Sequence, residues 1–214
     1  MNKIIIVLLS LVSGCSTLST TNITQELQQL DSSYQQSPIH AREQLQEIKS
    51  SHEKDARPWI TSGQWSLKEN DIARARIAFL QAKRLDVNNI DAYIGLGICA
   101  DQQRQHPQAQ MFYLQGLNIE HDNLKLKNNL AVSYLLSKQA KKAITILKPI
   151  ATTINKHNTE LLTEEKRLLS NLSLAYQMTG KPQLAYPLDK KLVGQVIAES
   201  NSQAAKSLFE SEQP

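Results

Sequence analysis

The hydrophobic positions of this chain recur at the spacing of α-helices. Between residues 23 and 34, apolar side chains are separated by steps of four, three and four, which places them on one face of a helix. These side chains are Ile23, Leu27, Leu30 and Tyr34. Leu, Gln, Ser, Ala, Ile and Lys are the commonest residues, whereas Gly and Pro number only seven each, and the abundance of Leu, Gln, Ala and Lys favours helices over strands. The pattern therefore predicts an all-α chain.

A set of small and aromatic residues returns every 34 positions, three times without a gap. The first two copies pair Trp59 with Tyr93, Gly63 with Gly97, Ala75 with Ala109, Phe79 with Tyr113 and Ala82 with Gly116. The third copy consists of Leu130, Ala131, Tyr134, Ala143, Leu147 and Ile150. We expect the small residues to lie where two helices cross closely, and Phe79 to fill the space between one helical pair and the next.

This period and residue pattern resemble the tetratricopeptide repeat (TPR), whose signature of aromatic, Leu, Gly and Tyr, then Ala, Phe and Ala, spans two antiparallel helices. The resemblance implies an all-α TPR solenoid, in which antiparallel helix pairs stack in a right-handed superhelix. The predicted segments are a degenerate helical hairpin at 23–55, TPR 1 at 56–89, TPR 2 at 90–123, TPR 3 at 124–163 with an enlarged linker, TPR 4 at 164–197 and a polar tail at 198–214.

The fourth copy is displaced, because its side chains follow those of the third by 42 positions instead of 34. The additional residues fall around 152–163, where they lengthen the turn, the preceding helix or the following helix. Thr163 is a candidate N-cap, because Glu164 and Glu165 would then lie in the first turn, where the helix dipole favours negative charge.

Both ends of the array depart from the repeat pattern. Ser37 and Pro38 offer an N-cap and a first helical residue to the second helix of the degenerate hairpin. In the fourth copy, Pro187 is expected to kink or shorten the second helix, and Asp189 stands where a large apolar residue is expected. We therefore expect little to stack beyond it, and the tail from 194 to 214 is either a frayed capping helix or disordered.

The first 14 residues fit a signal peptide. A positive start, an apolar core of about nine residues and small residues before Cys15 are typical of secretory signals, and the core is shorter than the ~20 apolar residues of a membrane span. Val12-Ser13-Gly14-Cys15 resembles a bacterial lipobox, which implies that residues 1–14 are removed and that Cys15 carries lipid. Ser16 in the following position then implies transfer to the outer membrane, with 15–22 as a lipidated tether on the periplasmic face.

Charge and reactive residues argue against several classes of function. The formal net charge is +4 and no block of five Lys or Arg occurs, so nucleic acid is not the favoured partner. The five histidines never stand in HExxH or HxH spacing, and therefore no metal site is predicted. The glycines of "GLG" at 95–97 lack the third glycine of a dinucleotide loop, and "TSGQW" lacks the GxSxG turn of a hydrolase. We predict no enzyme and no cofactor, and a buried Cys99.

The TPR resemblance implies that the first helix of each pair lines a concave groove for a partner protein. Its apolar positions suit the apolar face of a helix or an extended peptide, and Asn129 and Asn171 are available to hold backbone amides. The predicted groove residues are Ile60, Gln64, Leu67, Ile94, Ile98, Asn128, Asn129, Val132, Leu135, Asn171, Leu174 and Met178. The sequence leaves open that several of these side chains pack within the hairpins or under an inserted N-terminal segment.

The third and fourth copies resemble a narrower group. The stretches "NNLAVSYLLSKQAKKAITILKPI" and "LLSNLSLAYQMTGKPQLAYPLDKKL" are similar to the TadD family, the TPR lipoproteins of the tight adherence (Flp pilus) secretion system. The resemblance implies an outer-membrane assembly factor for the secretin or other pilus components. Two alternatives remain open: a secretin assembly factor like the type IV pilus pilotins, and a general periplasmic scaffold for cell-envelope enzymes.

Overall fold

The computed structural model describes residues 19–157 and 162–193 of the 214-residue chain. Within these residues every regular element is an α-helix, and the prediction of an all-α fold is confirmed. The predicted lipid attachment site Cys15, the signal peptide and the tail from 194 to 214 lie outside the described residues.

Contacts divide the chain into two units, Met1–Glu53 and Lys54–Pro214. In the first unit, helices α1 (Ser19–Tyr34) and α2 (Pro38–Ser51) pack against each other as a hairpin. Pro38 is the first residue of α2, as predicted, because its fixed φ suits a helix start and its missing N–H has no acceptor there. The apolar positions that predicted the first helix are all buried, as are three apolar residues of α2: Ile23, Leu27, Leu30 and Tyr34, with Ala41, Leu45 and Ile48.

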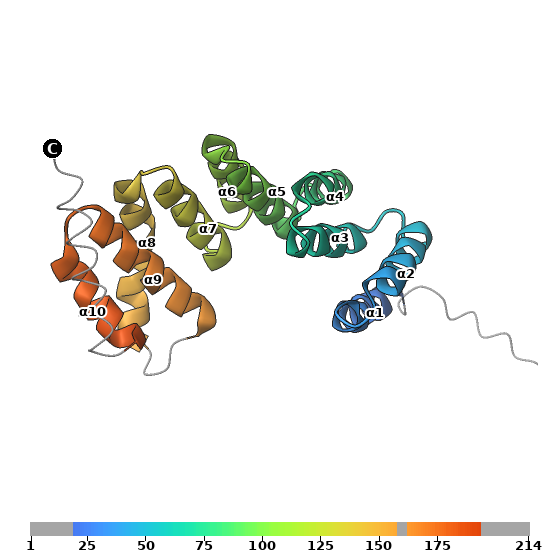
Figure 1. Cartoon of the computed structure of the whole chain (residues 1–214), viewed down its shortest axis with the longest axis horizontal. Helices are drawn as coiled ribbons and strands as arrows, with labels where there is room; N and C mark the ends of the chain where they lie inside the picture. Colours follow the sequence, from blue (N-terminus) through green and yellow to red (C-terminus); the bar gives the residue numbers. More distant parts are fainter. Residues whose placement is uncertain (1–18, 158–161, 194–214) are drawn as a thin grey trace, which may run out of the picture. The chain divides into compact units, whose positions relative to one another are not determined.

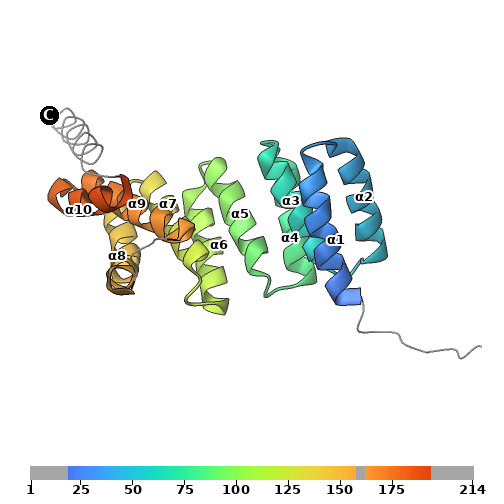
Figure 2. The same ribbon diagram turned by 90° about the horizontal axis from the view of Figure 1, so that it is seen from below.

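The second unit consists, in its described part, of four helical pairs that follow one another in chain order (Figures 1 and 2). The pairs are α3 (Arg57–Lys68) with α4 (Ile72–Leu85), α5 (Ile90–Gln102) with α6 (His106–Ile119), α7 (Leu124–Leu136) with α8 (Ala140–His157), and α9 (Thr163–Met178) with α10 (Pro182–Val193). Each helix contacts the next one in sequence, and the first helices of successive pairs also contact each other. The pairs are thus stacked hairpins.

Phe79 fills the space between the first two pairs of this unit, as the repeat predicts. Its ring lies against Gly63 of α3 and Gly95 of α5, since a Cβ atom on either glycine would lie within 2.7 or 2.5 Å of ring carbons. Tyr113 has the same role one repeat later, where a Cβ on Gly97 would lie 2.2 Å from the ring. The small residues therefore allow two helices to approach each other with an aromatic ring between them.

The turn inside each pair is built in the same way in all four repeats. A residue with positive φ follows each first helix: Asn70 at 60°, Arg104 at 59°, Lys138 at 60° and Gly180 at 68°. The first three are 34 positions apart and the last follows by 42, so this turn keeps the repeat spacing. Only the fourth repeat uses glycine, for which the left-handed conformation carries no Cβ penalty.

The additional residues before the fourth repeat lengthen both flanking helices. Helix α8 has 18 residues, whereas α4 and α6 have 14 each, and it continues through Pro149. Helix α9 has 16 residues, whereas α5 and α7 have 13 each. The prediction of Thr163 as N-cap is wrong, because Thr163 is already the first residue of α9 and Leu162 holds the N-cap position. The N–H of Leu162 donates to the Glu165 carboxylate at 2.8 Å, so an acidic side chain satisfies the helix start in place of a Thr hydroxyl.

The fourth pair accommodates its two irregular residues within the helix. Helix α10 contains Pro187 and continues to Val193. Asp189, which replaces an apolar residue of the pattern, is buried with 6% exposure. Its carboxylate accepts from the Ser173 hydroxyl and, at 3.1 Å, from the Gln177 amide. The buried charge is therefore hydrogen-bonded by α9, the partner helix of the same pair.

Candidate functional site

The predicted groove residues lie on the first helices α3, α5, α7 and α9 and differ in exposure. Ile60, Asn128 and Leu135 are buried; Leu67, Ile94, Ile98, Asn129, Val132 and Asn171 are half-buried; Gln64, Leu174 and Met178 are exposed. The twelve residues therefore do not form one uniform surface.

Several of the apolar residues belong to the hydrophobic core, so the alternative of packing within the hairpins applies to them. Ile60 is 7% exposed and Leu67 is packed against the same cluster, which includes Phe79. Ile94 packs against the next cluster, and Leu135, also 7% exposed, belongs to the one between α7 and α10. An apolar side chain at the border between groove and core gains more by turning toward the neighbouring helix than by staying in water.

Six of the remaining eight residues lie on α7 and α9, which contact each other, whereas Gln64 lies on α3 and Ile98 on α5. Three positions of the third repeat recur 42 residues later in the fourth, and each pair is similar in character. We call the six residues of these three pairs the α7–α9 surface: Asn129, Val132 and Leu136 on α7, and Asn171, Leu174 and Met178 on α9. Leu136, which is not among the twelve predicted residues, is 54% exposed.

Apolar side chains of this surface are exposed in rows along the helices. Leu174 is 45% and Met178 40% exposed, and the two are one helical turn apart on α9. Val132 and Leu136 have the same spacing on α7. Two adjacent rows of this kind match a partner that presents apolar side chains at three- and four-residue spacing.

An amide hydrogen bond connects the two helices next to the apolar rows. Asn171 Nδ2 on α9 donates to Asn128 Oδ1 on α7 at 2.8 Å. The sequence predicted that Asn129 and Asn171 hold a partner's backbone, whereas the structure pairs Asn171 with the buried Asn128. Asn129, half-buried beside them, is the amide that this hydrogen bond does not involve.

A cluster around Asp101 joins three helices and was not predicted. Its Oδ1 lies 2.8 Å from His106 Nδ1 of α6 and accepts from Ser133 Oγ of α7 at 2.8 Å. Its Oδ2 accepts from the Tyr113 hydroxyl at 3.2 Å. Burial, and then the Asp101 charge, raise the pKa of Tyr113. The repeat spacing in the sequence does not predict such a cluster, because its members lie on different helices.

The Asp101 cluster contains Ser, His and Asp but does not have the geometry of a catalytic triad. In a triad the imidazole stands between the hydroxyl and the carboxylate and accepts the hydroxyl proton. Here Ser133 Oγ and His106 Nδ1 both meet the same carboxylate oxygen of Asp101. The hydroxyl proton is therefore directed to the carboxylate, and the arrangement serves to hold α5, α6 and α7 together.

Metal-binding clusters and membrane spans are both absent from the described part of the chain. Within 19–157 and 162–193, no three His, Cys, Asp or Glu side chains are grouped so that they could hold a metal ion. None of the helices in these two ranges has the length and apolar character needed to cross a bilayer.

No family model and no curated protein matches this sequence. Solved structures do match it: TTC0263, a thermophilic TPR protein of Thermus thermophilus, superposes with a TM-score of 0.64 at 15% identity, over 85% of this chain and 97% of that one. The chain is a tetratricopeptide-repeat solenoid.

Two other solved structures extend the comparison. YrrB, described as a TPR protein with an unusual peptide-binding site, matches with a TM-score of 0.59 at 17% identity, over 79% of this chain and 85% of that one. Pseudomonas aeruginosa pilF matches with a TM-score of 0.56 at 17% identity, over 74% and 77%. At these low sequence identities, the similarity shows a shared fold and nothing about a shared function.

Proposed function

We propose that this TPR solenoid is a protein-binding scaffold and that its α7–α9 surface takes the apolar face of a partner helix or extended peptide. The observation that carries the proposal is the recurrence of Val132 and Leu136 as Leu174 and Met178, exposed or half-buried on two adjacent helices. Buried side chains at repeat positions serve the fold, whereas exposed apolar side chains in adjacent rows mark interaction sites. The peptide-binding site of YrrB, a protein with the same fold, agrees with this function.

A partner helix fits this surface by its side-chain spacing. Leu174 and Met178 meet apolar residues at three- and four-residue spacing, and the half-buried Asn129 supplies an amide at the border. The surface contains no charged side chain, so the partner segment is expected to be apolar in its centre. This role requires neither catalysis nor a cofactor.

The lipobox extends the proposal to the cell envelope. Acylation of Cys15 would anchor the solenoid to the periplasmic face of the outer membrane, and two or three acyl chains hold a protein there stably. With the resemblance of residues 128–150 and 168–192 to the TadD family, this supports an assembly factor of the tight adherence (Flp pilus) system, acting on the secretin or another pilus component. A pilotin-like factor of type IV pili and a general scaffold for cell-envelope enzymes are the alternatives.

Binding of a partner at the α7–α9 surface is tested by placing negative charge on its exposed apolar residues of α9. In the full chain, Leu174→Glu with Met178→Glu should abolish recovery of the partner from detergent extracts, because two carboxylates would be buried without partners. The control is Thr145→Glu with Lys148→Glu, two exposed residues of α8, which should leave recovery unchanged. Binding that survives in the first variant, with circular dichroism still helical, overturns the proposal.

The identity of the recovered protein separates the envelope functions. Recovery of a secretin together with pilus components supports an assembly factor, and the pilus type named by those components decides between the Flp and type IV systems. Recovery of only cell-wall synthases or hydrolases overturns both and supports the general scaffold.

The anchor is tested separately through Cys15. Cys15→Ser should leave a folded protein that is lost from the outer-membrane fraction, whereas Cys99→Ser, at a buried position, should remain there. Outer-membrane recovery of the Cys15→Ser protein equal to that of the unchanged chain would contradict lipid anchoring.

A further inference from the structure

The second helices of the first three repeats contain no acidic residue. Neither α4, α6 nor α8 includes Asp or Glu at any position, whereas α4 and α8 carry several Lys and Arg residues. The cations with described side chains are Arg74, Arg76, Lys83 and Arg84 on α4, and Lys141, Lys142 and Lys148 on α8. Helices α4 and α8 thus combine positive charge with the absence of negative charge along their whole length, whereas α6 contains neither Lys nor Arg.

Three of the four repeating outward positions on α4 and on α6 are apolar, against one on α2 and none on α8. In α2, α4, α6 and α8, four exposed positions recur at the 34-residue spacing. We call the eight on the first two repeats the α4–α6 face: Ala73, Ile77, Leu80 and Arg84, with Pro107, Met111, Leu114 and Asn118. The corresponding positions are Lys141, Thr145, Lys148 and Thr152 on α8, and Ile39, Glu43, Gln46 and Ser50 on α2.

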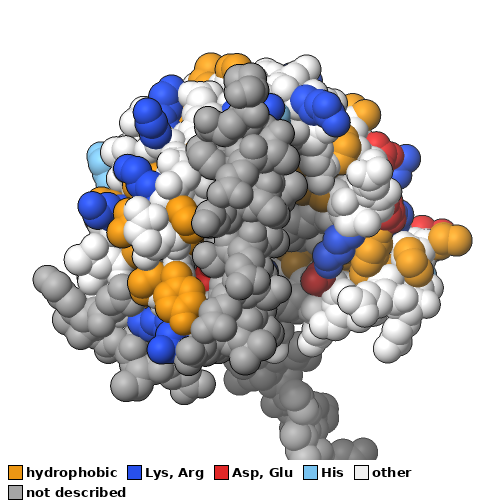
Figure 3. All heavy atoms as spheres, turned by 60° about the vertical axis from the view of Figure 1, so that its left-hand side comes forward, with side chains coloured by type: hydrophobic (Ala, Val, Ile, Leu, Met, Phe, Trp, Pro, Cys, Tyr) orange, Lys and Arg blue, Asp and Glu red, His pale blue; other side chains and the backbone are white. Residues whose placement is uncertain are grey.

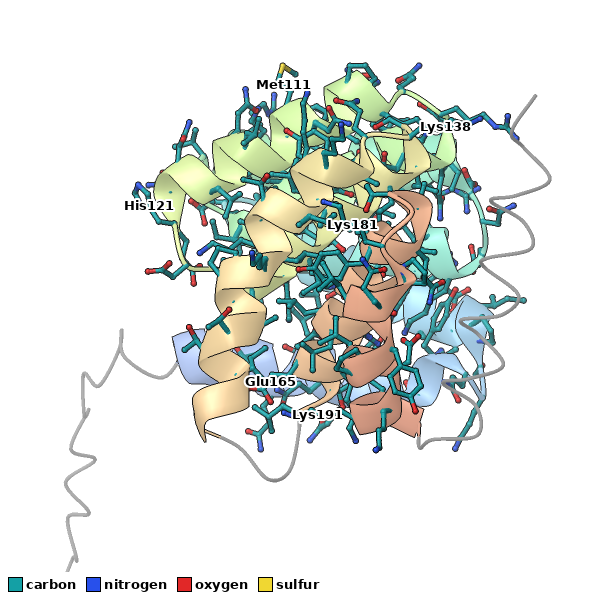
Figure 4. The ribbon with its side chains drawn as sticks, turned by 90° about the vertical axis from the view of Figure 1, so that its left-hand side faces the viewer. Met111, His121, Lys138, Glu165, Lys181 and Lys191 are labelled. Carbon is teal, nitrogen blue, oxygen red and sulfur yellow. The ribbon has the colours of Figure 1, made fainter. Side chains whose placement is uncertain are left out.

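The exposure of this face is not explained by the fold. Ile77 is 65% and Met111 46% exposed, although a polar residue at the same position serves equally well in α8. Figure 4 shows Met111 on the outer side of α6, pointing away from the neighbouring helices. Figure 3 shows the side of the molecule that carries the last repeats, where Lys and Arg side chains lie at the upper left.

A lysine joins α4 and α6 beneath the face. Lys83 Nζ of α4 lies 4.9 Å from the ring centroid of Tyr93 on α5 and 5.6 Å from that of Phe112 on α6. Lys83 therefore reaches from α4 to α6, although the backbones of these two helices do not contact each other and each packs against α5.

We propose that the α4–α6 face rests on an anionic lipid membrane, with its apolar side chains at the level of the headgroups and acyl chains. Apolar side chains next to Lys and Arg are the composition of helices that lie in a membrane interface. Phosphate headgroups supply the negative charge that the cations of α4, among them Arg84 on the face itself, complement. The inference goes beyond the proposed function and stands whether or not Cys15 is acylated.

The charges disfavour the other occupants. A second copy of this chain on the same face would bring Arg84 and the other cations of α4 against themselves, and like charges repel. Nucleic acid would meet the cations but would leave the apolar side chains of the face without a role. Binding of an acidic protein to the α4–α6 face is the other outcome that the test below can detect.

The acidic residues of these repeats lie at the helix ends. Asp71, the N-cap of α4, is 3.4 Å from Arg74. Asp86 and Glu120 hold the C-cap positions of α4 and α6. The middle turns, where the large apolar side chains of the face are located, are therefore the part of the face that can approach an anionic surface most closely.

The test places an environment-sensitive fluorophore on the face in the full chain. Cysteine is introduced as Ile77→Cys or Leu114→Cys in a Cys15→Ser background, in which the remaining native thiol, Cys99, is buried. Thr145→Cys is the matched control, because it occupies in α8 the position of Ile77. All variants share the same N-terminal segment, so a difference between them reports the face itself.

With vesicles of phosphatidylcholine and phosphatidylglycerol, we expect a blue shift and a several-fold rise in emission at 77 and 114, and little change at 145. The response should weaken in phosphatidylcholine alone, at high salt, and after Arg84→Glu. An equal response at 77 and 145, an equal response to neutral vesicles, or no response would each overturn the proposal. A photo-crosslink from Ile77 to an acidic protein without any vesicle response would assign the face to that protein instead.

Discussion

Ser133 on α7 donates its hydroxyl to the carboxylate of Asp101 on α5 at 2.8 Å, across the boundary between the second and third repeats. The same carboxylate meets His106 and Tyr113 of α6. One nearly buried charge therefore holds three helices in a fixed arrangement, and the first helices that it connects carry the groove positions.

Asp101→Ala should lower the free energy of unfolding by about 3 kcal/mol, because it leaves the buried Tyr113 and Ser133 hydroxyls without their acceptor. The measurement is urea unfolding followed by circular dichroism, with unchanged m-value. Asp91→Ala is the control, since Asp91 is exposed on the same helix and should change stability by less than about 0.5 kcal/mol. Equal effects of the two changes would show that the cluster does not contribute to stability.

Gly97→Leu should prevent the solenoid from folding. A Cβ at this position already lies 2.2 Å from the Tyr113 ring, and a leucine adds three further carbons to a helix crossing that has no space for them. Far-ultraviolet circular dichroism and limited proteolysis should report loss of helix and rapid cleavage. Gln102→Leu, at an exposed position of the same helix, should remain folded; a folded Gly97→Leu protein would contradict the close crossing.

Arg104→Gly and Lys138→Gly should each stabilise the protein by about 0.5 kcal/mol. Both residues have φ near +60°, where a side chain costs about 1 kcal/mol, and the added flexibility of glycine in the unfolded chain offsets part of this gain. Asn70→Gly is the matched comparison in the first repeat and should have a smaller effect, because Asn tolerates this conformation. Denaturation midpoints measured side by side give the ranking. Destabilisation by both glycines would refute the assignment of strain to these turns.

Alkaline pH should weaken the fold through Cys99. Burial raises the pKa of its thiol from the ordinary 9.0 to about 11, so the folded state holds this proton more tightly than the unfolded state does. The contribution is therefore complete below pH 9 and is lost as the pH rises through 11, by about 2 kcal/mol. Burial also raises the pKa of Tyr113, which acts in the same direction.

Cys99→Ala isolates the thiol from the tyrosine. The variant should lose less stability between pH 9 and 11 than the unchanged chain, while both lose the part that belongs to Tyr113. Parallel curves of unfolding free energy against pH for the two proteins would exclude the thiol as a source of this dependence.

The helical repeat could be predicted from the sequence because it depends on local spacing. Apolar periodicity predicts the helices, and the 34-residue period predicts the position of Phe79 between two pairs, where its ring lies against Gly63 and Gly95. The start of α9 was harder to locate, because Thr163 and Leu162 are adjacent and the deciding contact is a hydrogen bond from the Leu162 N–H to the Glu165 carboxylate.

The groove was predicted less well than the repeat. A repeat position fixes the helix and the approximate face, but Leu135 is buried while its neighbour Leu136 is 54% exposed. The rotation of each helix against its neighbours decides which of two adjacent apolar residues reaches water, and this rotation depends on the side chains of other helices. For the same reason, the bond between Asn171 and Asn128 and the cluster around Asp101 could not be found from spacing alone.

The sequence by itself thus determined that this chain forms stacked helical pairs, because periodic burial and small residues at helix crossings are properties of neighbouring positions in the chain. Only the tertiary structure decided which apolar residues remain exposed on α7 and α9 and on α4 and α6. That choice arises from contacts between residues far apart in sequence, such as Asn128 with Asn171 and Lys83 with Phe112, which fix how each helix is turned against the next.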